Sequence, residues 1–403
     1  MDNNTKETMS RSIKEIEKDF NKILRKKYGN KYLIRLSPSR PRIKKNQNSR
    51  KQASYVNFSL LPEELKSYLD KFIIKQDKAK TILATKICTH FHRIKIYKNQ
   101  TSPGFIKSNI ILIGPTGVGK TYMIKLISEK LGVPFIKADA TKFSETGYIG
   151  ADTEELILNL VDEAKGNIEL AEHGIVYIDE VDKIASSGQT FGPDVSRTGV
   201  QRGLLKIMEE TEINLQNYYD PIFLNKFTKT KINTKNILFI VSGAFEGLQE
   251  LIKDRVKKKT IGFDNKNVNK KISTEEDNNT NYLQYVKPKD LVKFGFESEF
   301  IGRIPIVAVL NDLAEVDLYE ILKNKNSSIV NEKKKDFKAY GIDLEFEDEA
   351  LYKIAQIAYQ EKTGARGLVS VMEDVLMEYE GTLPSKKAKY LKITKGMIAT
   401  AIK

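Results

Sequence analysis

Cysteine is almost absent from this sequence, which has only Cys88 among its 403 residues. This excludes an intramolecular disulfide and is typical of a protein in a reducing, cytoplasmic compartment. Long apolar stretches are lacking too, since none approaches the roughly 18 residues that a membrane-spanning helix needs. Residues 1–4 do not have the basic-then-apolar layout of a secretory signal. We therefore predict a cytoplasmic protein that is not integral to a membrane.

Acidic residues are scarce in the first 56 positions, which hold 16 Lys and Arg against 5 Asp and Glu, a net charge of +11. The other 347 residues hold 51 against 48, so they contribute only +3 to the total of +14. Residues 36–54 are rich in Ser, Pro, Lys and Asn, a composition that buries too little apolar surface to fold. We predict that residues 1–56 are a basic, largely disordered segment, and that no other part of the chain has the charge to attract nucleic acid.

Apolar runs alternate with helical patterns over the middle of the chain. Nearly continuous runs of Ile, Val and Leu predict strands covered on both faces. These runs are residues 109–113, 133–138, 175–179, 236–242 and 306–310. We predict an α/β fold in which a parallel five-stranded sheet lies between helices.

The pattern changes after residue 310. Helical periodicity then dominates, and only residues 343–346 and 390–393 read as short strands. This predicts a smaller, mainly helical α+β domain at the C-terminus. We place the domain boundaries at residues 57–312 and 313–403, after the basic segment 1–56.

A glycine-rich segment follows the first predicted strand and precedes a predicted helix at residues 119–131. It fits the pattern G-x-x-x-x-G-K-[ST] and consists of Gly114, Pro115, Thr116, Gly117, Val118, Gly119, Lys120 and Thr121. Backbone N–H groups of such a loop surround phosphate oxygens. The lysine reaches the β- and γ-phosphates, and the hydroxyl group binds Mg²⁺. We predict a nucleotide site for ATP with Mg²⁺, in which Thr121 is one metal ligand.

Two acidic residues end the predicted strand at residues 175–179. Asp179 is placed to help hold the metal ion, and Glu180 to orient and activate the attacking water. Acids at the end of a strand are ordinary by themselves. Together with the phosphate-binding loop they indicate ATP hydrolysis.

Several ordered motifs resemble those of the ClpX family of AAA+ unfoldases, which feed the ClpP peptidase. They are residues 114–121, 138–141, 146–150, 174–183, 299–303 and 362–367. The resemblance extends over residues 57–403. It implies an AAA+ P-loop NTPase domain followed by a small C-terminal domain, and a ring in which the nucleotide lies between neighbouring subunits.

The resemblance also implies roles for residues around the nucleotide. Arg303 matches the arginine finger, which reaches the γ-phosphate of the neighbouring subunit, and Arg366 matches the sensor arginine of the small domain. Ser242, at the end of its strand, is a candidate for the first sensor or for a turn cap. Ile73 and Ile74 match the box that holds adenine, although the family usually has glycine at the next position, where this chain has Lys75.

Two further motifs imply contacts with other proteins. Tyr148 and Ile149 lie between glycines and resemble the loop that grips substrate in the axial channel. Ile261, Gly262 and Phe263 match the tripeptide that docks the ring onto ClpP. Apolar anchors on a tether suit a ring of clefts because several weak contacts add through avidity.

One family feature is missing from the sequence. The family's N-terminal zinc-binding domain needs four cysteines, so we expect no structural zinc here. Cys88, His90 and His92 lie close together on a predicted helix, but two possible ligands on one helical face are more often part of a core than of a metal site.

We predict an ATPase that acts as a homohexameric protein unfoldase and delivers protein substrates to a ClpP-type peptidase. One alternative is an HslU-type unfoldase, although no large insertion follows the second nucleotide motif. A second is a remodelling chaperone that acts without a peptidase. A third is a nucleic-acid-remodelling AAA+ motor, against which the near-neutral charge of residues 57–403 argues.

Overall fold

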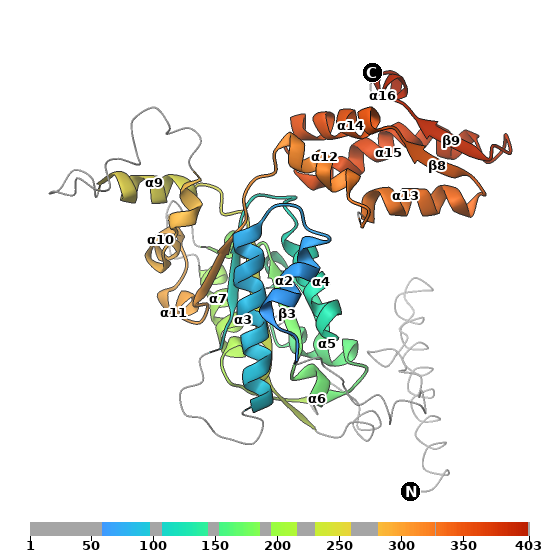
Figure 1. Ribbon diagram of the computed structural model, residues 1–403. Coiled ribbons are helices and arrows are strands. Elements are labelled where there is room, and N and C mark those ends of the chain that lie inside the picture. The colour runs from blue at the N-terminus through green and yellow to red at the C-terminus, as the bar shows by residue number, and fades with distance from the viewer. Residues whose placement is uncertain are drawn as a thin grey trace, which may run out of the picture. The chain divides into compact units, whose positions relative to one another are not determined.

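The computed structural model of the protein describes residues 59–96, 107–143, 153–185, 195–215, 230–258, 281–326 and 328–401 (Figure 1). Three predicted features lie outside these ranges: the basic segment 1–56, the channel residues Tyr148 and Ile149, and the docking tripeptide 261–263.

A parallel five-stranded sheet forms the centre of the larger domain, as predicted. Its strand order is β2-β3-β6-β1-β7. The strands are β1 (Ile110–Ile113), β2 (Phe135–Asp139), β3 (Ile175–Asp179), β6 (Leu238–Gly243) and β7 (Ile306–Val309). Ile110 at the start of β1 lies opposite Ile240 of β6 and Ile306 of β7. Because all five strands run the same way, the residues that follow them meet at one edge of the sheet, which we call the carboxyl edge.

The three inner strands of this sheet, β3, β6 and β1, are buried on both faces, which is why they read as continuous apolar runs, whereas the edge strands β2 and β7 are mostly half-buried. On β1, Ile110 and Leu112 belong to one apolar cluster, and Ile111 and Ile113 belong to another. The first cluster contains residues of helices α2 (Pro62–Asp70), α3 (Asp77–Ile96) and α4 (Lys120–Leu131). The second contains residues of α5 (Glu155–Glu163), α6 (Ile168–Ala171), α7 (Val195–Met208), α9 (Leu248–Lys258), α10 (Pro288–Phe294) and α11 (Ser298–Gly302).

Helix α3 carries the residues that could have been mistaken for a metal site. Cys88 is only 2% exposed, and His90 is fully buried. The imidazole Nε2 of His90 lies 3.0 Å from the carbonyl oxygen of Asn236, just before β6. Cys88 therefore belongs to the core, as predicted, and so does His90. His92, on the same helical face as Cys88, is only partly buried, and its Nε2 lies 3.2 Å from the Leu60 carbonyl oxygen.

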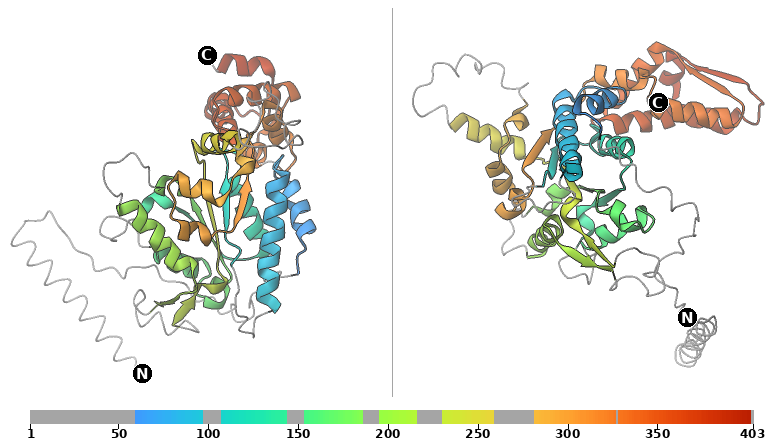
Figure 2. Two further views of the ribbon diagram at one scale, coloured as in Figure 1. Left: turned by 90° about the vertical axis from the view of Figure 1, so that its left-hand side faces the viewer. Right: turned by 60° about the horizontal axis from the view of Figure 1, so that its bottom comes forward.

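The C-terminal part of the chain is mainly helical, as predicted, and is drawn in orange to red in Figures 1 and 2. Its helices are α12 (Glu315–Lys323), α13 (Ser328–Ala339), α14 (Asp348–Gln360), α15 (Ala365–Thr382) and α16 (Lys395–Ala401). The strands β8 (Asp343–Phe346) and β9 (Tyr390–Ile393) pair in parallel, at the positions predicted from the sequence. In the core, α12 packs on α14 and α14 packs on α15.

Smaller elements complete the described chain. An antiparallel pair, β4 (Glu212–Asn214) and β5 (Lys231–Asn233), lies apart from the main sheet. A 3-10 helix, η7 (Tyr282–Tyr285), precedes α10. Across the described ranges, none of the helices combines the length and the apolar character that crossing a membrane would require.

Candidate active site

The phosphate-binding loop connects the end of β1 to the start of α4, at the carboxyl edge of the sheet. Gly117 and Gly119 have φ angles of 76° and 95°, in the left-handed region that favours glycine. Gly119 is the N-cap of α4, so the unpaired N–H groups of the first helical turn face the loop. This arrangement suits an anion, because the positive end of a helix and free N–H donors coincide.

Lys120 starts α4, and its ammonium group curls back over the loop. Its Nζ donates hydrogen bonds to the carbonyl oxygens of Gly114 and Pro115. Burial lowers the pKa of Lys120 to about 8, and the nearby Asp179 carboxylate opposes part of that change. The ammonium group is thus held by backbone acceptors that the oxygens of a phosphate could replace.

The predicted metal-binding pair comes together at this edge. The Thr121 hydroxyl donates to Asp179 Oδ2 at 3.2 Å. Asp179 Oδ1 accepts hydrogen bonds from the Ser242 hydroxyl at 2.6 Å and from the Glu180 N–H at 3.1 Å, and Lys137 Nζ lies 3.1 Å from Oδ2. Burial would raise the pKa of Asp179, but the hydrogen bonds from Ser242 and Lys137 outweigh it and hold the pKa below its usual value. An ionised carboxylate beside a hydroxyl oxygen is a donor set that fits Mg²⁺.

Ser242 lies behind this pair and not in the pocket wall. Its side chain is fully buried, and its hydroxyl is used by Asp179. Ser242, the candidate for the first sensor or for a turn cap, is thus placed to orient the carboxylate that would bind the metal.

Tyr177 is a member of the site that the motifs did not reveal. Its buried hydroxyl lies 2.7 Å from Ser242 Oγ and 3.1 Å from Thr121 Oγ1. Tyr177 and Asp179 are two positions apart on β3, so they point to the same face of the sheet. This alternation of side chains along a strand could have identified Tyr177 from the sequence. A hydroxyl group two residues before a metal-binding acid lies on the same face of the sheet and can form a hydrogen bond beside that acid.

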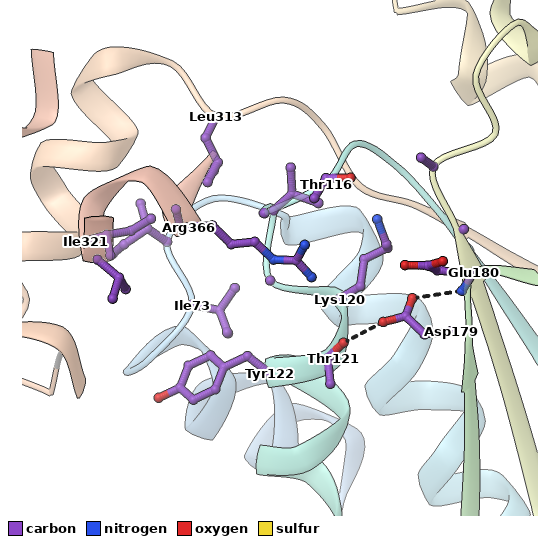
Figure 3. Close-up of a pocket in the computed structure, with 18 of the residues that line it drawn as sticks. Ile73, Thr116, Lys120, Thr121, Tyr122, Asp179, Glu180, Leu313, Ile321 and Arg366 are labelled. Atoms are coloured by element: carbon purple, nitrogen blue, oxygen red, sulfur yellow. Dashed lines mark hydrogen bonds between the residues drawn. The ribbon is translucent and has the colours of Figure 1, made fainter. Parts of the chain in front are cut away.

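Glu180 follows β3 with a φ of 57°, an uncommon value for a residue with a side chain. Its carboxylate is exposed and lines the pocket together with Lys120 and Asp179 (Figure 3). This geometry fits the predicted role of Glu180 as the group that activates water.

The other half of the pocket is apolar, and the whole cavity measures about 370 Å³. Ile73 and Ile74, in the turn between α2 and α3, form one wall, as the adenine prediction requires. Leu313 and Ile321 line it from the C-terminal part of the chain (Figure 3), and so does Val369. A flat apolar base would be enclosed between these walls.

Arg366 enters the pocket from the second position of α15. The Ala365 N–H donates to the Gly117 carbonyl at 2.9 Å, which ties the start of α15 to the phosphate-binding loop. The backbones approach so closely that a Cβ at Gly117 would clash with the Thr363 carbonyl oxygen. Figure 3 shows the Arg366 guanidinium group directed toward Lys120, where phosphate would lie.

Arg303 lies at the opposite edge of the sheet, which we call the amino edge. Its carbonyl accepts a hydrogen bond from Asn109 Nδ2 at 2.9 Å, directly before β1, whereas the phosphate-binding loop directly follows β1. Its guanidinium group pairs with Glu209 at 2.6 Å. Arg303 is not among the residues that line the pocket of its own chain.

Comparison with known proteins agrees with this geometry. Residues 106–307 match the family model of the AAA domain (Cdc48 subfamily), and residues 313–379 match the C-terminal, D2-small domain of ClpB protein. Among curated proteins, the "ATP-dependent Clp protease ATP-binding subunit ClpX" of Borrelia duttonii is 41% identical over 347 residues, which cover 84% of this chain and 78% of that protein. The protein of the same name from Treponema denticola is 42% identical over 343 residues, or 84% and 81% of the two chains.

The chain belongs to the ClpX family. It is accordingly an ATPase with a nucleotide-binding AAA domain. The pocket lined by Ile73, Lys120 and Arg366 is the candidate for its nucleotide site. The individual roles of the site residues stay predictions. So do the channel residues and the docking tripeptide, which lie outside the described ranges.

Proposed function

We propose that this ClpX-family chain is an ATP-dependent protein unfoldase that works as a homohexamer and moves protein substrates through the axial channel of its ring. The observation that carries the proposal is the convergence of Lys120, Asp179, Glu180 and Arg366 on one pocket with an apolar slot beside it. The geometry supports hydrolysis as well as binding, because an exposed carboxylate lies next to the phosphate-binding loop.

Different residues of the chain would bind the metal ion, bind the phosphates and accept the proton. Thr121 and Asp179 would hold Mg²⁺, which when bound supplies positive charge beside the phosphates. Lys120 and the N–H groups of the loop bind the phosphate oxygens, and Glu180 accepts a proton from the attacking water. Arg366 adds positive charge from the smaller domain, so that the presence of phosphate biases the position of α15.

A ring supplies the remaining positive charge. Arg303 is separated from its own pocket by the length of β1, which is about 13 Å for four residues. It would serve the pocket of the next subunit if the amino edge of one chain faced the nucleotide of its neighbour. A repeated head-to-tail contact of this kind forms a closed ring when its rotation completes a full turn, as six subunits would in the proposed homohexamer.

The partner of the ring is proposed from the relatives. Their printed name makes them the ATP-binding subunit of a Clp protease, and we extend this to a ClpP-type peptidase for the present chain. Residues 261–263 would dock into that peptidase, and Tyr148 and Ile149 would grip the substrate.

Replacing Glu180 by glutamine tests the central claim. We expect ATP turnover to fall by about 10² to 10⁴, because the general base is lost, while nucleotide binding persists. The measurement is phosphate release together with calorimetric binding of ATP, with the exposed Glu250→Gln on α9 as the matched control. Undiminished ATP hydrolysis would show that Glu180 is not the general base.

The same variant distinguishes the alternative functions. Because it holds ATP without turnover, substrates and partners should remain bound during a pull-down. Recovery of folded proteins with a Clp peptidase supports the proposal, whereas recovery of proteins without a peptidase indicates a remodelling chaperone. Recovery of a peptidase that is not of the ClpP type indicates an HslU-type unfoldase, and nucleic acid that stimulates the wild-type ATPase indicates a nucleic-acid motor.

A further inference from the structure

Two successive residues beside the apolar slot have an uncommon backbone conformation. Lys75 and Gln76, at the end of the turn between α2 and α3, have φ angles of 60° and 65°. Residues with a Cβ seldom adopt this left-handed conformation, and two in a row must be held by their surroundings. The glycine expected from the family at position 75 would adopt it without strain.

Gln76 is held by a reciprocal pair of hydrogen bonds to one distant residue. Its Nε2 donates to the Asn311 carbonyl at 2.7 Å, and its Oε1 accepts from the Asn311 N–H at 2.8 Å. The side chain is only 2% exposed, so these bonds form largely away from water. Asn311 is itself fixed, since its Oδ1 accepts from Asn281 at 3.0 Å and from Gln284 at 3.2 Å.

Lys75 extends the same connection toward the smaller domain. Its Nζ donates to the Asp312 carbonyl at 2.9 Å and pairs with Asp317 Oδ2 at 2.6 Å. Asp317 also accepts the Ala314 N–H at 2.7 Å at the start of α12. The turn therefore contacts both ends of the link that leads from β7 into α12.

These contacts lie directly behind the apolar slot. Ile74 and Leu313 both line the pocket; Ile74 is two residues before Gln76, and Leu313 is two residues after Asn311. The hydrogen bonds of Gln76 and the ion pair of Lys75 therefore tie the segment that carries Ile74 to the segment that carries Leu313. We call Gln76 and Lys75, with Asn311, Asp312 and Asp317, the slot clamp.

We propose that the slot clamp sets the width of the slot for a purine base, which makes Gln76 and Lys75 positioning residues for base recognition. This proposal rests on the proposed nucleotide binding, and it assigns recognition of the phosphates and of the base to different residues. The phosphate-binding loop recognises the phosphates without the clamp, whereas the base is bound tightly only while the clamp holds the segments of Ile74 and Leu313 together.

The test compares two probes that share only the phosphates: ADP and inorganic tripolyphosphate, each titrated into the full chain by calorimetry. For Gln76→Ala we expect ADP to bind about tenfold more weakly, which is the effect of losing two buried hydrogen bonds. Tripolyphosphate should bind within about twofold of its wild-type affinity. An unchanged ADP affinity, or an equal loss for both probes, would overturn the proposal.

Gln201 provides a matched control. It is 1% exposed, and its amide likewise donates to a backbone carbonyl, of Ile184 at 2.8 Å, and accepts from a backbone N–H, of Glu297 at 2.9 Å. Gln201→Ala should lose comparable thermal stability without altering the ratio of the two dissociation constants. A similar change in that ratio would mean that destabilisation alone weakens base binding.

Lys75→Gly decides the question if Gln76→Ala does not fold. Glycine relieves the backbone strain at this partly exposed position but removes the ion pair with Asp317. We expect ADP to bind about threefold more weakly with no loss of melting temperature, and unchanged ADP affinity would contradict the proposal. If the wild-type chain bound neither probe, the proposed ATPase function would fail, and that result is distinct from failure of the clamp.

Discussion

The two edges of the central sheet each hold a lysine that is largely removed from water, and of these two described residues it is Lys120 that lines the pocket of the candidate site. At the carboxyl edge, burial lowers the pKa of Lys120 to about 8. At the amino edge, burial lowers the pKa of Lys107 to about 7. Both ammonium groups donate to backbone carbonyls, including that of Pro115 for Lys120 and that of Thr234, at 2.6 Å, for Lys107.

The two lysines differ in whether their surroundings leave room for an anion to bind. Lys120 lines the nucleotide pocket, where an arriving anion can replace its carbonyl partners. Lys107 lies over the Phe239 ring, 5.1 Å from its centroid, and donates to the carbonyl of Glu209, whose side chain pairs with Arg303. Desolvation alone therefore does not mark a functional lysine; access to a cavity does.

Replacing Arg303, at the amino edge, has the largest expected effect, because it should change ATP turnover without changing nucleotide binding at the carboxyl edge. Arg303→Ala should lower ATP turnover by about 10³, because positive charge at the transferred phosphoryl group is lost across the ring. Binding of ADP to the same variant should be unchanged, since Arg303 is remote from its own pocket. Phosphate release and calorimetry measure the two quantities.

Glu209→Gln is the control for that result, because it removes the ion-pair partner of Arg303 and keeps the arginine. Turnover by this variant should stay within severalfold of the wild type. If Arg303→Ala weakened ADP binding as strongly as turnover, the arginine would act on its own subunit and the comparison of the two edges would fail.

Replacing each lysine by methionine tests the comparison directly. Lys120→Met should weaken ATP binding by about two orders of magnitude, because a buried charge that pairs with phosphate is removed. Lys107→Met should leave ATP affinity within about twofold of the wild type. Equal losses in the two variants, measured by calorimetry, would contradict the assignment of phosphate binding to the carboxyl edge alone.

His90 makes the amino edge sensitive to acid. Burial lowers the pKa of His90 to about 4, and its hydrogen bond with the Asn236 carbonyl opposes this only in part. Between about pH 6.5 and 4 the unfolded chain binds a proton at this residue that the folded chain does not, so stability falls as the pH falls.

Between pH 7 and 5 we expect the free energy of unfolding to drop by about 2 kcal/mol more in the wild type than in His90→Gln. Urea unfolding of both chains at the two pH values measures the difference, and titration of the other groups cancels between them. An equal drop would show that His90 is protonated in the folded protein.

Tyr177 gives the smallest predicted effect, at the carboxyl edge. Tyr177→Phe removes the hydroxyl that contacts Ser242 and Thr121, so the metal-binding pair should be less well oriented. About tenfold more Mg²⁺ should be needed for half-maximal ATP turnover. Tyr282→Phe, which changes another buried tyrosine on η7, should not alter the Mg²⁺ requirement; a similar shift in both would argue against the specific role of Tyr177.

Much of the site could be predicted because its parts are local or follow directly from the sheet. The loop at residues 114–121 encodes its own conformation through two glycines at positive φ. Thr121 and Asp179 meet because parallel strands end at one edge. The contacts of Ser242 and Tyr177 could not be predicted, because they depend on the direction of each side chain and neither residue belongs to a motif that specifies it.

The sequence by itself determined the buried strands, the phosphate-binding loop and the acids that follow β3, because each depends on neighbours in the chain. Only the tertiary structure decided that the Gln76 side chain is hydrogen-bonded to the backbone of Asn311, 235 residues further along the chain. It also decided that the Ala365 N–H donates to the Gly117 carbonyl and that Arg303 lies away from its own pocket. The physical reason is that a side-chain amide or a backbone N–H has no preferred partner until folding brings one within hydrogen-bonding distance.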